Sequence, residues 1–183
     1  MRRSHYVAAL GLGTLLALAP AAAPAATEVV FVSGAFRRSI PVDDLEHLAA
    51  TGQARGLLAD LVRFGRQTPA QVAQLLNLSI PLPLVPTSRF LNSAPGTAIL
   101  QRLGRILFPL RAPAVAVPAL RAATINGLVR GNGSITPVAF LRAYPSNDLA
   151  VSLPALQDAM NQVGAMSGLV KGFLDTDIKP NAK

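Results

Sequence analysis

The residues best suited to acid–base chemistry are grouped around His47, the single histidine after residue 5. His47 follows Asp43 by four residues and Asp44 by three, so a helix would place both carboxylates near the imidazole. A carboxylate could then orient the imidazole as a general base, with a hydroxyl such as that of Ser39 as nucleophile. The same spacing also fits a charged pair at the start of a surface helix, which is the more frequent arrangement. We therefore assign no catalytic residue.

Other motifs for catalysis or ligand binding are incomplete. The segment Gly131-Asn132-Gly133-Ser134-Ile135 comes closest to a Gly-x-Ser-x-Gly nucleophile elbow, but it lacks the final glycine and follows a helical pattern instead of a strand. It also lacks the lysine of a phosphate-binding loop. Nine scattered acids, among them Asp175 and Asp177, and the absence of cysteine give no metal-ligand cluster of recognisable spacing. We expect neither a metal nor a cofactor.

The chain is strongly basic, with 17 Lys and Arg residues against nine acids, and 14 of the 17 are arginine. Five of the arginines could form an anion site, although dispersed arginines are more often solvated or paired: Arg37, Arg38, Arg89, Arg121 and Arg142. A positive surface favours anionic lipid, cell-wall polymer or an acidic protein as partner. Nucleic acid is not expected, because the arginines are spread over several elements and aromatic residues make up only 5% of the chain.

Residues 1–25 have the pattern of a signal peptide. They comprise the basic pair Arg2-Arg3, an apolar run over residues 6–18, the helix breaker Pro20, and the small-x-small cleavage site Ala23-Pro24-Ala25. An uncleaved membrane anchor is the alternative, since residues 7–26 carry no charge, but the alanines and prolines of their second half are only weakly hydrophobic. Cleavage leaves 15 basic and nine acidic residues, a net charge of +6. We expect an exported protein, periplasmic or extracellular, with no stable membrane span after cleavage and no cysteine for lipid attachment.

The stretch from residue 28 to 52 predicts a β-hairpin followed by a capped helix. The half-buried alternation of strands is carried by Val29, Phe31, Phe36, Arg38 and Ile40, with Ser33-Gly34 as the turn. Asp43 and Glu46 have the spacing of a capping box, and Gly52 suits the left-handed residue that ends a helix.

Further along, the pattern is mostly helical and is interrupted by proline and glycine. The first expected helix has an apolar stripe of Leu57, Leu58, Leu61 and Val62, and the second, after a capping box at Thr68 and Gln71, has a buried face of Val72, Leu75 and Leu76. Short helices are expected over residues 87–91, after Ser93 with an apolar stripe of Ile99, Leu100, Leu103, Ile106 and Leu107, from about Pro118 to Gly131, and after the cap Thr136-Pro137. A final helix is expected to direct Leu156, Met160, Val163 and Leu169 inward. Residues 78–86 read as a buried extended connection because of their prolines, and residues 149–153 as a possible third strand.

These elements predict an α+β fold, mainly helical, in which about six to eight short helices pack on an N-terminal hairpin. A hydrophobic content of 51% in 183 residues suits one core. We expect one domain over residues 26–174 and a flexible tail over residues 175–183.

Several blocks of sequence resemble one known family. They are Val29-Val30 through Gly34, Arg38-Ser39-Ile40, Val42-x-Asp44-Leu45-Glu46, Thr51-Gly52, Arg89-Phe90-Leu91, Gly96, Leu100, Leu103-Gly104, Ile106, Leu120-Arg121-Ala122, Phe140-Leu141 and Tyr144-Pro145. In order and spacing they resemble an exported domain of unknown function, found mainly in cyanobacterial proteins described as alpha/beta hydrolases. In those proteins the domain lies after the signal peptide and before the hydrolase domain. The resemblance implies no site residues, because the function of the domain itself is unsettled.

Two hypotheses of function remain open. In the first, the chain is an exported, non-catalytic helical module that docks on a separate hydrolase or another exported protein, or holds an apolar ligand, since no hydrolase segment follows the domain. In the second, it is an enzyme or a remnant of the alpha/beta-hydrolase family that acts on esters or lipids, for which His47, Asp44 and a hydroxyl such as Ser39 would have to meet in a pocket. We favour the first, because the residues supply a hydrophobic core but no complete catalytic set.

Overall fold

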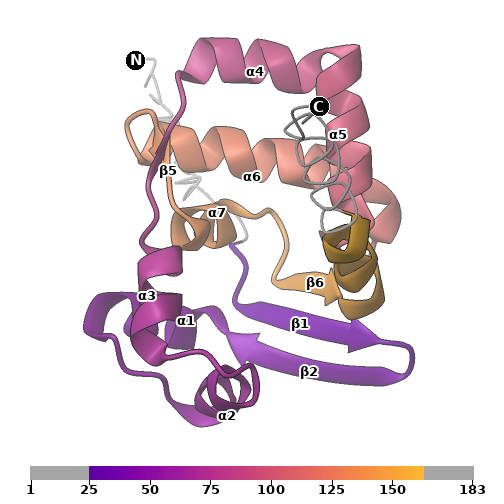
Figure 1. Cartoon of the computed structure of the whole chain (residues 1–183). Helices are drawn as coiled ribbons and strands as arrows, with labels where there is room; N and C mark the ends of the chain where they lie inside the picture. The colour runs from indigo at the N-terminus through magenta and orange to yellow at the C-terminus, as the bar shows by residue number, and fades with distance from the viewer. Residues whose placement is uncertain (1–24, 163–183) are drawn as a thin grey trace, which may run out of the picture.

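The computed structural model describes residues 25–162 (Figure 1). Residues 1–24 of the predicted signal peptide (residues 1–25) lie outside this range. Val163, Leu169 and the predicted tail from residue 175 lie outside it as well.

A four-stranded mixed sheet forms the base of the fold. Its strand order is β2-β1-β6-β4, and the strands are β1 (Glu28–Ser33), β2 (Phe36–Pro41), β4 (Leu107–Pro109) and β6 (Asp148–Ser152). β1 pairs antiparallel with β2 and parallel with β6, and β6 pairs antiparallel with β4. The two central strands therefore come from opposite ends of the described chain, and nearly all helices lie between them in sequence (Figure 1).

The N-terminal hairpin forms as the alternating pattern predicts. Val29 of β1 lies opposite Ile40 of β2, and both side chains are buried. The turn contains Gly34 at a φ of +59°, a conformation that glycine adopts without steric cost. The predicted third strand is confirmed as β6, which places Leu149 beside Val29.

Helices account for most of the remaining described chain, so the α+β prediction is confirmed. They are α1 (Val42–Thr51), α2 (Gly56–Phe64), α3 (Pro69–Leu76), α4 (Leu84–Asn92), α5 (Ala94–Gly104), the short 3-10 helix η1 (Pro113–Val115), α6 (Ala116–Arg130) and α7 (Pro137–Ala143). Residues 153–162 are helical as well. A second, two-stranded sheet pairs β3 (Ile80–Pro81) with β5 (Ser134–Ile135).

Three helix starts follow local signals in the sequence. Thr68 and Gln71 form the predicted capping box of α3, with Pro69 at the first helical position. The side chain of Ser93 accepts a hydrogen bond from the amide of Gly96 in α5, and Thr136 does the same for Ala139 in α7. These bonds satisfy amide groups that the first turn of a helix leaves unpaired.

The buried side chains form two clusters. The larger joins the sheet to α4, α5, α6 and α7, and its fully buried members include Tyr144, Leu120 and Leu149. The smaller joins Ile40 of the hairpin to Leu48, Leu58, Val62 and Ala73 of α1, α2 and α3. Phe31 and Leu45 contact both clusters, so the hairpin and α1 connect the two halves of the fold.

Helix α1 begins differently from the prediction. Its N-cap is Pro41, which has no capping side chain, and no capping hydrogen bond links Asp43 and Glu46 to the helix start. The predicted capping box at Asp43 and Glu46 is therefore wrong, although Gly52 does end the helix at a φ of +70°. The two acids instead bind a distant arginine, as described below.

The predictions of burial after residue 74 are also partly wrong. The sequence predicts burial of residues 78–86, but most of their large side chains are exposed and α4 already begins at Leu84. Leu75 is 62% exposed and Met160 is 65% exposed, although both are predicted to face inward. Leu107, predicted to be helical, lies in β4, a three-residue strand formed by pairing with β6.

Candidate functional site

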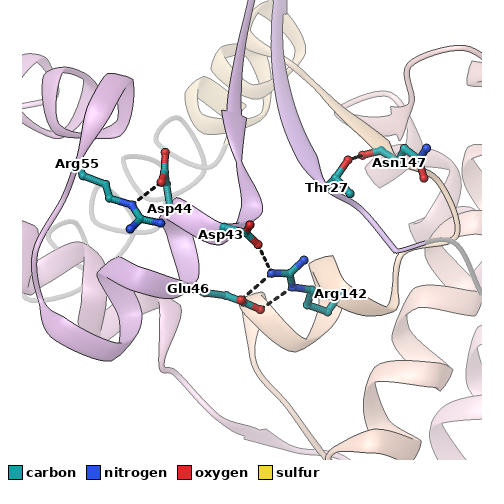
Figure 2. A network of polar contacts seen from close by, with 7 residues as sticks. All are labelled: Thr27, Asp43, Asp44, Glu46, Arg55, Arg142 and Asn147. Atoms are coloured by element: carbon teal, nitrogen blue, oxygen red, sulfur yellow. Dashed lines mark hydrogen bonds and ion pairs between the residues drawn. The ribbon is translucent and has the colours of Figure 1, made fainter. Parts of the chain in front are cut away.

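Helix α1 carries the acids and the histidine that the sequence offers for catalysis. Figure 2 shows Asp43, Asp44 and Glu46 on its first turns, with Arg142 of α7 and Arg55 reaching toward them. Because Val42 and Leu48 bury the inner face of α1, the acids point away from the core. Acidic residues at the start of a helix also interact favourably with the helix dipole.

The guanidinium of Arg142 binds Asp43 and Glu46 together. Arg142 Nε donates to Glu46 Oε1 and Arg142 Nη2 donates to Glu46 Oε2, each at 2.6 Å, and Nη2 also donates to Asp43 Oδ1 (Figure 2). This bidentate geometry matches the planar fork of arginine to a carboxylate. We call these three residues the arginine clamp; it connects α1 to α7, elements that lie nearly 100 residues apart in sequence.

The electrostatics of the clamp favour its charged form. The hydrogen bonds from Arg142 hold the pKa of Glu46 below its usual value, against a smaller opposing effect of burial. The pKa of Arg142 is raised, mainly by the hydrogen bonds to Glu46 and Asp43. The lowered pKa keeps the Glu46 carboxylate ionised and bound to Arg142 near neutral pH, which does not suit a general acid.

Asp44 is engaged separately. Arg55, just before α2, donates from Nε to Asp44 Oδ1 at 2.6 Å (Figure 2). This pair closes the short loop between α1 and α2 and leaves Asp44 bound to an arginine instead of the histidine.

The structure does not assemble the hypothetical catalytic set. His47 is partly buried, and among residues 25–162 no side-chain hydrogen bond of the imidazole to Asp43, Asp44 or Ser39 is present. Ser39 lies on β2, where it is exposed and pairs with Val30 of β1. The two acids proposed to orient the histidine instead form ion pairs with arginines, Asp43 with Arg142 and Asp44 with Arg55.

The five arginines of the hypothetical anion site lie on four different elements. Arg37 and Arg38 are on β2, where the Arg38 guanidinium lies 5.4 Å from the centre of the Phe36 ring. Arg89 is on α4, and Arg142 belongs to the clamp. Arg121 of α6 donates to the carbonyl oxygen of Leu91 at 3.0 Å and to Thr97 Oγ1 at 3.3 Å, which ties α4 and α5 to α6.

The segment from Gly131 to Ile135 is a tight turn that leads into β5. Asn132 and Gly133 have φ angles of +50° and +89°. The Ser134 hydroxyl donates to the carbonyl oxygen of Gly131 at 2.9 Å, so it is used within the turn. A side chain on Gly131 would lie 2.0 Å from the Ser134 carbonyl oxygen, which explains the glycine at that position.

Residues 25–162 offer neither a metal cluster nor a membrane-spanning helix. Within that range no group of three or more His, Cys, Asp or Glu side chains is arranged to hold a metal ion. No helix in the same range combines the length and the hydrophobicity needed to cross a bilayer.

A comparison with protein families identifies the chain. The model of a family described as "Alpha/beta hydrolase of unknown function (DUF1400)" matches residues 25–152. The chain belongs to this family. A search of curated proteins and a search of solved structures each found no match.

The match to the alpha/beta hydrolase family of unknown function covers both sheets and every helix from α1 to α7. The arginine clamp, the Asp44–Arg55 pair and the two hydrophobic clusters therefore all lie in the part of the chain that carries the family resemblance. The family description names a hydrolase but no substrate.

The matched region also contains an exposed apolar segment. Between Arg66 and Arg89 the chain has no charged residue, and five large apolar side chains there are exposed: Leu75, Leu78, Ile80, Leu84 and Val85. We call residues 75–85 the apolar connector. It links α3 to α4 along one side of the molecule (Figure 1). Its hydropathy predicts burial, so no signal in the sequence indicates its exposure.

Proposed function

We propose that this chain is a non-catalytic docking module that binds a separate alpha/beta hydrolase through the apolar connector. The observation that carries the proposal is the exposure of five large apolar side chains in a segment without charge. Surfaces of this kind are typical of protein–protein interaction sites, because exposed apolar area is costly in water.

The backbone of the connector is preformed for binding. Ile80 and Pro81 pair with Ile135 and Ser134 of β5, and the amide of Leu82 donates to the Gly133 carbonyl oxygen at 2.8 Å. Pro81 and Pro83 further restrict the extended conformation. A segment that is already ordered loses less conformational entropy on binding, so more of the apolar contact energy is retained.

The choice of a hydrolase as partner rests on the family. The chain belongs to a family described as an alpha/beta hydrolase of unknown function. In the domain that its sequence resembles, the hydrolase part follows in the same polypeptide. The acids nearest to His47 are bound by arginines, which supports a binding role over catalysis by this chain itself.

Export supplies the setting that we propose for this interaction. The signal-peptide pattern of residues 1–25 supports a periplasmic or extracellular location, with a mature chain that starts at Ala26. N-terminal sequencing of the exported protein tests this directly. An intact N-terminus at Met1 in a membrane fraction would contradict it.

The docking proposal is tested by titrating the chain with exported alpha/beta hydrolases of the same organism. Val85→Glu places a charge on the connector, and Ile99→Glu places the same charge on an exposed site of α5 as the matched control. We expect a one-to-one complex whose Kd rises at least tenfold for Val85→Glu and stays within twofold for Ile99→Glu. Val85 lies in the first turn of α4, where a negative charge suits the helix dipole, so loss of folding is not expected. Equal affinities of the two variants, or no complex, would overturn the proposal.

The non-catalytic part of the proposal has its own test. The purified chain is assayed against short-chain esters, with His47→Ala as the comparison. We expect no turnover by either protein. Turnover that disappears in His47→Ala would overturn this part and support the enzymatic alternative on esters or lipids.

A further inference from the structure

A hollow of about 300 Å³ lies between α2 and the start of α3. Its lining residues are Ala54, Ala59, Val62, Arg63, Gln67 and Pro69. None of them belongs to the apolar connector or to the arginine clamp. Figure 1 shows α2 at the bottom of the fold with α3 above it, at the end remote from α4.

The hollow is lined by apolar side chains together with one cationic and one amide side chain. Ala54, Ala59 and Val62 present apolar groups, whereas Arg63 contributes a permanent cation and Gln67 an amide that can donate hydrogen bonds. No acidic residue lines the hollow. Asp60, one turn before Arg63 on α2, forms no ion pair with it in the described part of the chain. The cation is therefore available to an incoming anion.

The walls of the hollow are held by the backbone. The backbone amide of Gln67 donates to the Val62 carbonyl oxygen at 3.1 Å, and this bond folds the chain back at the end of α2. Pro69 and the capping box at Thr68 then fix the start of α3. Val62 is buried in the smaller hydrophobic cluster, so the floor of the hollow is part of the core. A preformed apolar recess with a few polar groups is the usual form of a small-molecule site.

We propose that this hollow binds a small amphiphile that ends in an anionic group, and specifically a medium-chain carboxylate. The alkyl chain would lie against Ala54, Ala59 and Val62, and the carboxylate would accept hydrogen bonds from Arg63 and Gln67. Arginine matches a carboxylate in charge and in planar geometry. At about 30 Å³ for a water-sized group, the hollow accommodates on the order of ten non-hydrogen atoms, the size of octanoate. This inference is independent of the proposed docking to a hydrolase.

The test is a titration of the full chain with octanoate, kept below the concentration at which it forms micelles, and followed by backbone amide NMR. A ligand of this size in an open recess predicts a Kd of roughly 0.1–1 mM. We expect the largest shifts at Ala59, Arg63 and Gln67. Arg63→Gln should raise the Kd at least fivefold, whereas Arg102→Gln, which removes the same charge from an exposed site on α5, should leave it within twofold.

Steric block of the recess and removal of the ligand's charge give two more tests of the site. Ala59→Leu fills the recess and should abolish binding, with circular dichroism to verify that the variant is folded. Octanamide, which has the same length and no charge, should bind at least fivefold more weakly. Equal affinity of Arg63→Gln and Arg102→Gln, or equal affinity for octanamide, would overturn the proposal.

The anionic group could also come from a bilayer, since the exposed Phe64 follows Arg63 directly. Sedimentation with vesicles of phosphatidylglycerol tests that source. We expect no sedimentation beyond that with neutral phosphatidylcholine vesicles. Vesicle binding that survives Ala59→Leu and is lost in Phe64→Ser would assign Arg63 to a membrane contact and overturn the recess as the site.

Discussion

Arg142 of α7 and Glu46 of α1 form two parallel hydrogen bonds of 2.6 Å, although 96 residues separate them. The same guanidinium also binds Asp43. This contact joins the helix that follows the hairpin to the helix that precedes β6, and so it closes the chain around the central strand pair. In the described structure the arginine clamp therefore holds α1 and α7 in their relative positions.

Replacing Arg142 by Gln should destabilise the fold. The substitution removes the charge and the bidentate geometry and leaves two carboxylates close together without a cation. Since the Arg142 and Glu46 side chains are 32% and 39% exposed, solvent screening limits the loss to about 1–2 kcal/mol. Urea unfolding at pH 7 measures it.

The control for this substitution is Arg111→Gln. Arg111 Nε lies 3.4 Å from Asp148 Oδ2, and the Arg111 side chain is 89% exposed. Its replacement should therefore lower the free energy of unfolding by less than about 0.5 kcal/mol. If Arg142→Gln cost no more than Arg111→Gln, the clamp would not stabilise the fold.

The clamp also predicts a dependence of stability on pH. Because the folded state lowers the pKa of Glu46, its contribution is complete above the unfolded pKa of about 4.3 and is lost as the pH falls through the folded pKa. Unfolding free energies of the wild type and of Arg142→Gln should therefore converge as the pH falls below about 4. Urea titrations between pH 7 and pH 3 measure the difference. A difference that stays constant over this range would show that Glu46 is not the group responsible.

Gly96 is required by the close approach of α4 and α5. A Cβ on Gly96 would lie 1.9 Å from the carbonyl oxygen of Phe90, a backbone atom that cannot move aside. Gly96→Ala should therefore cost about 3 kcal/mol or more, and thermal unfolding will detect it. Gly65→Ala is the matched control, because Gly65 has a φ of −71° and its nearest neighbouring atom is at 3.3 Å. A similar melting temperature for both variants would contradict the close packing of α4 on α5.

The sequence predicts the parts of this fold that depend on neighbouring residues. The Ser33-Gly34 turn and the caps at Thr68, Ser93 and Thr136 form as expected, because each signal and its partner lie within a few residues. Family membership is also predicted, from blocks of residues spread over most of the chain.

The errors arise where a distant partner decides the outcome. Asp43 and Glu46 have the spacing of a capping box, but Arg142 offers stronger charge-assisted bonds and the helix starts two residues earlier, after Pro41, without a side-chain cap. β4 exists only because Leu107 pairs with Val151 of β6. Hydropathy likewise predicts burial of the apolar connector, whose large side chains are in fact exposed. Hydropathy reports the preference of a side chain for an apolar environment, but not whether other elements of the fold cover it.

In the candidate site, too, the sequence predicts what neighbouring residues determine and misses what distant residues determine. Spacing alone places the acids of α1 near His47, and they do lie on the same helix. Spacing carries no information on Arg142 and Arg55, which bind those acids. The hollow beside Arg63 is not predicted either, because it depends on how the turn after α2 folds back.

Tyr144 provides a test of the core. Its side chain is fully buried against Phe140, with ring centres 6.0 Å apart, and its hydroxyl has no hydrogen-bond partner in the described structure. Burial accordingly raises the pKa of Tyr144. A buried hydroxyl without a partner costs free energy, so Tyr144→Phe should be neutral or stabilising by up to about 1 kcal/mol.

Tyr144→Leu is the comparison variant, since it also removes the ring. It should destabilise by about 2 kcal/mol or more through the lost volume, which separates the effect of the ring from that of the hydroxyl. Chemical denaturation of the two variants and the wild type gives both values. A loss above about 1 kcal/mol for Tyr144→Phe would mean that the hydroxyl does have a partner, such as a buried water molecule, and that this part of the core is polar.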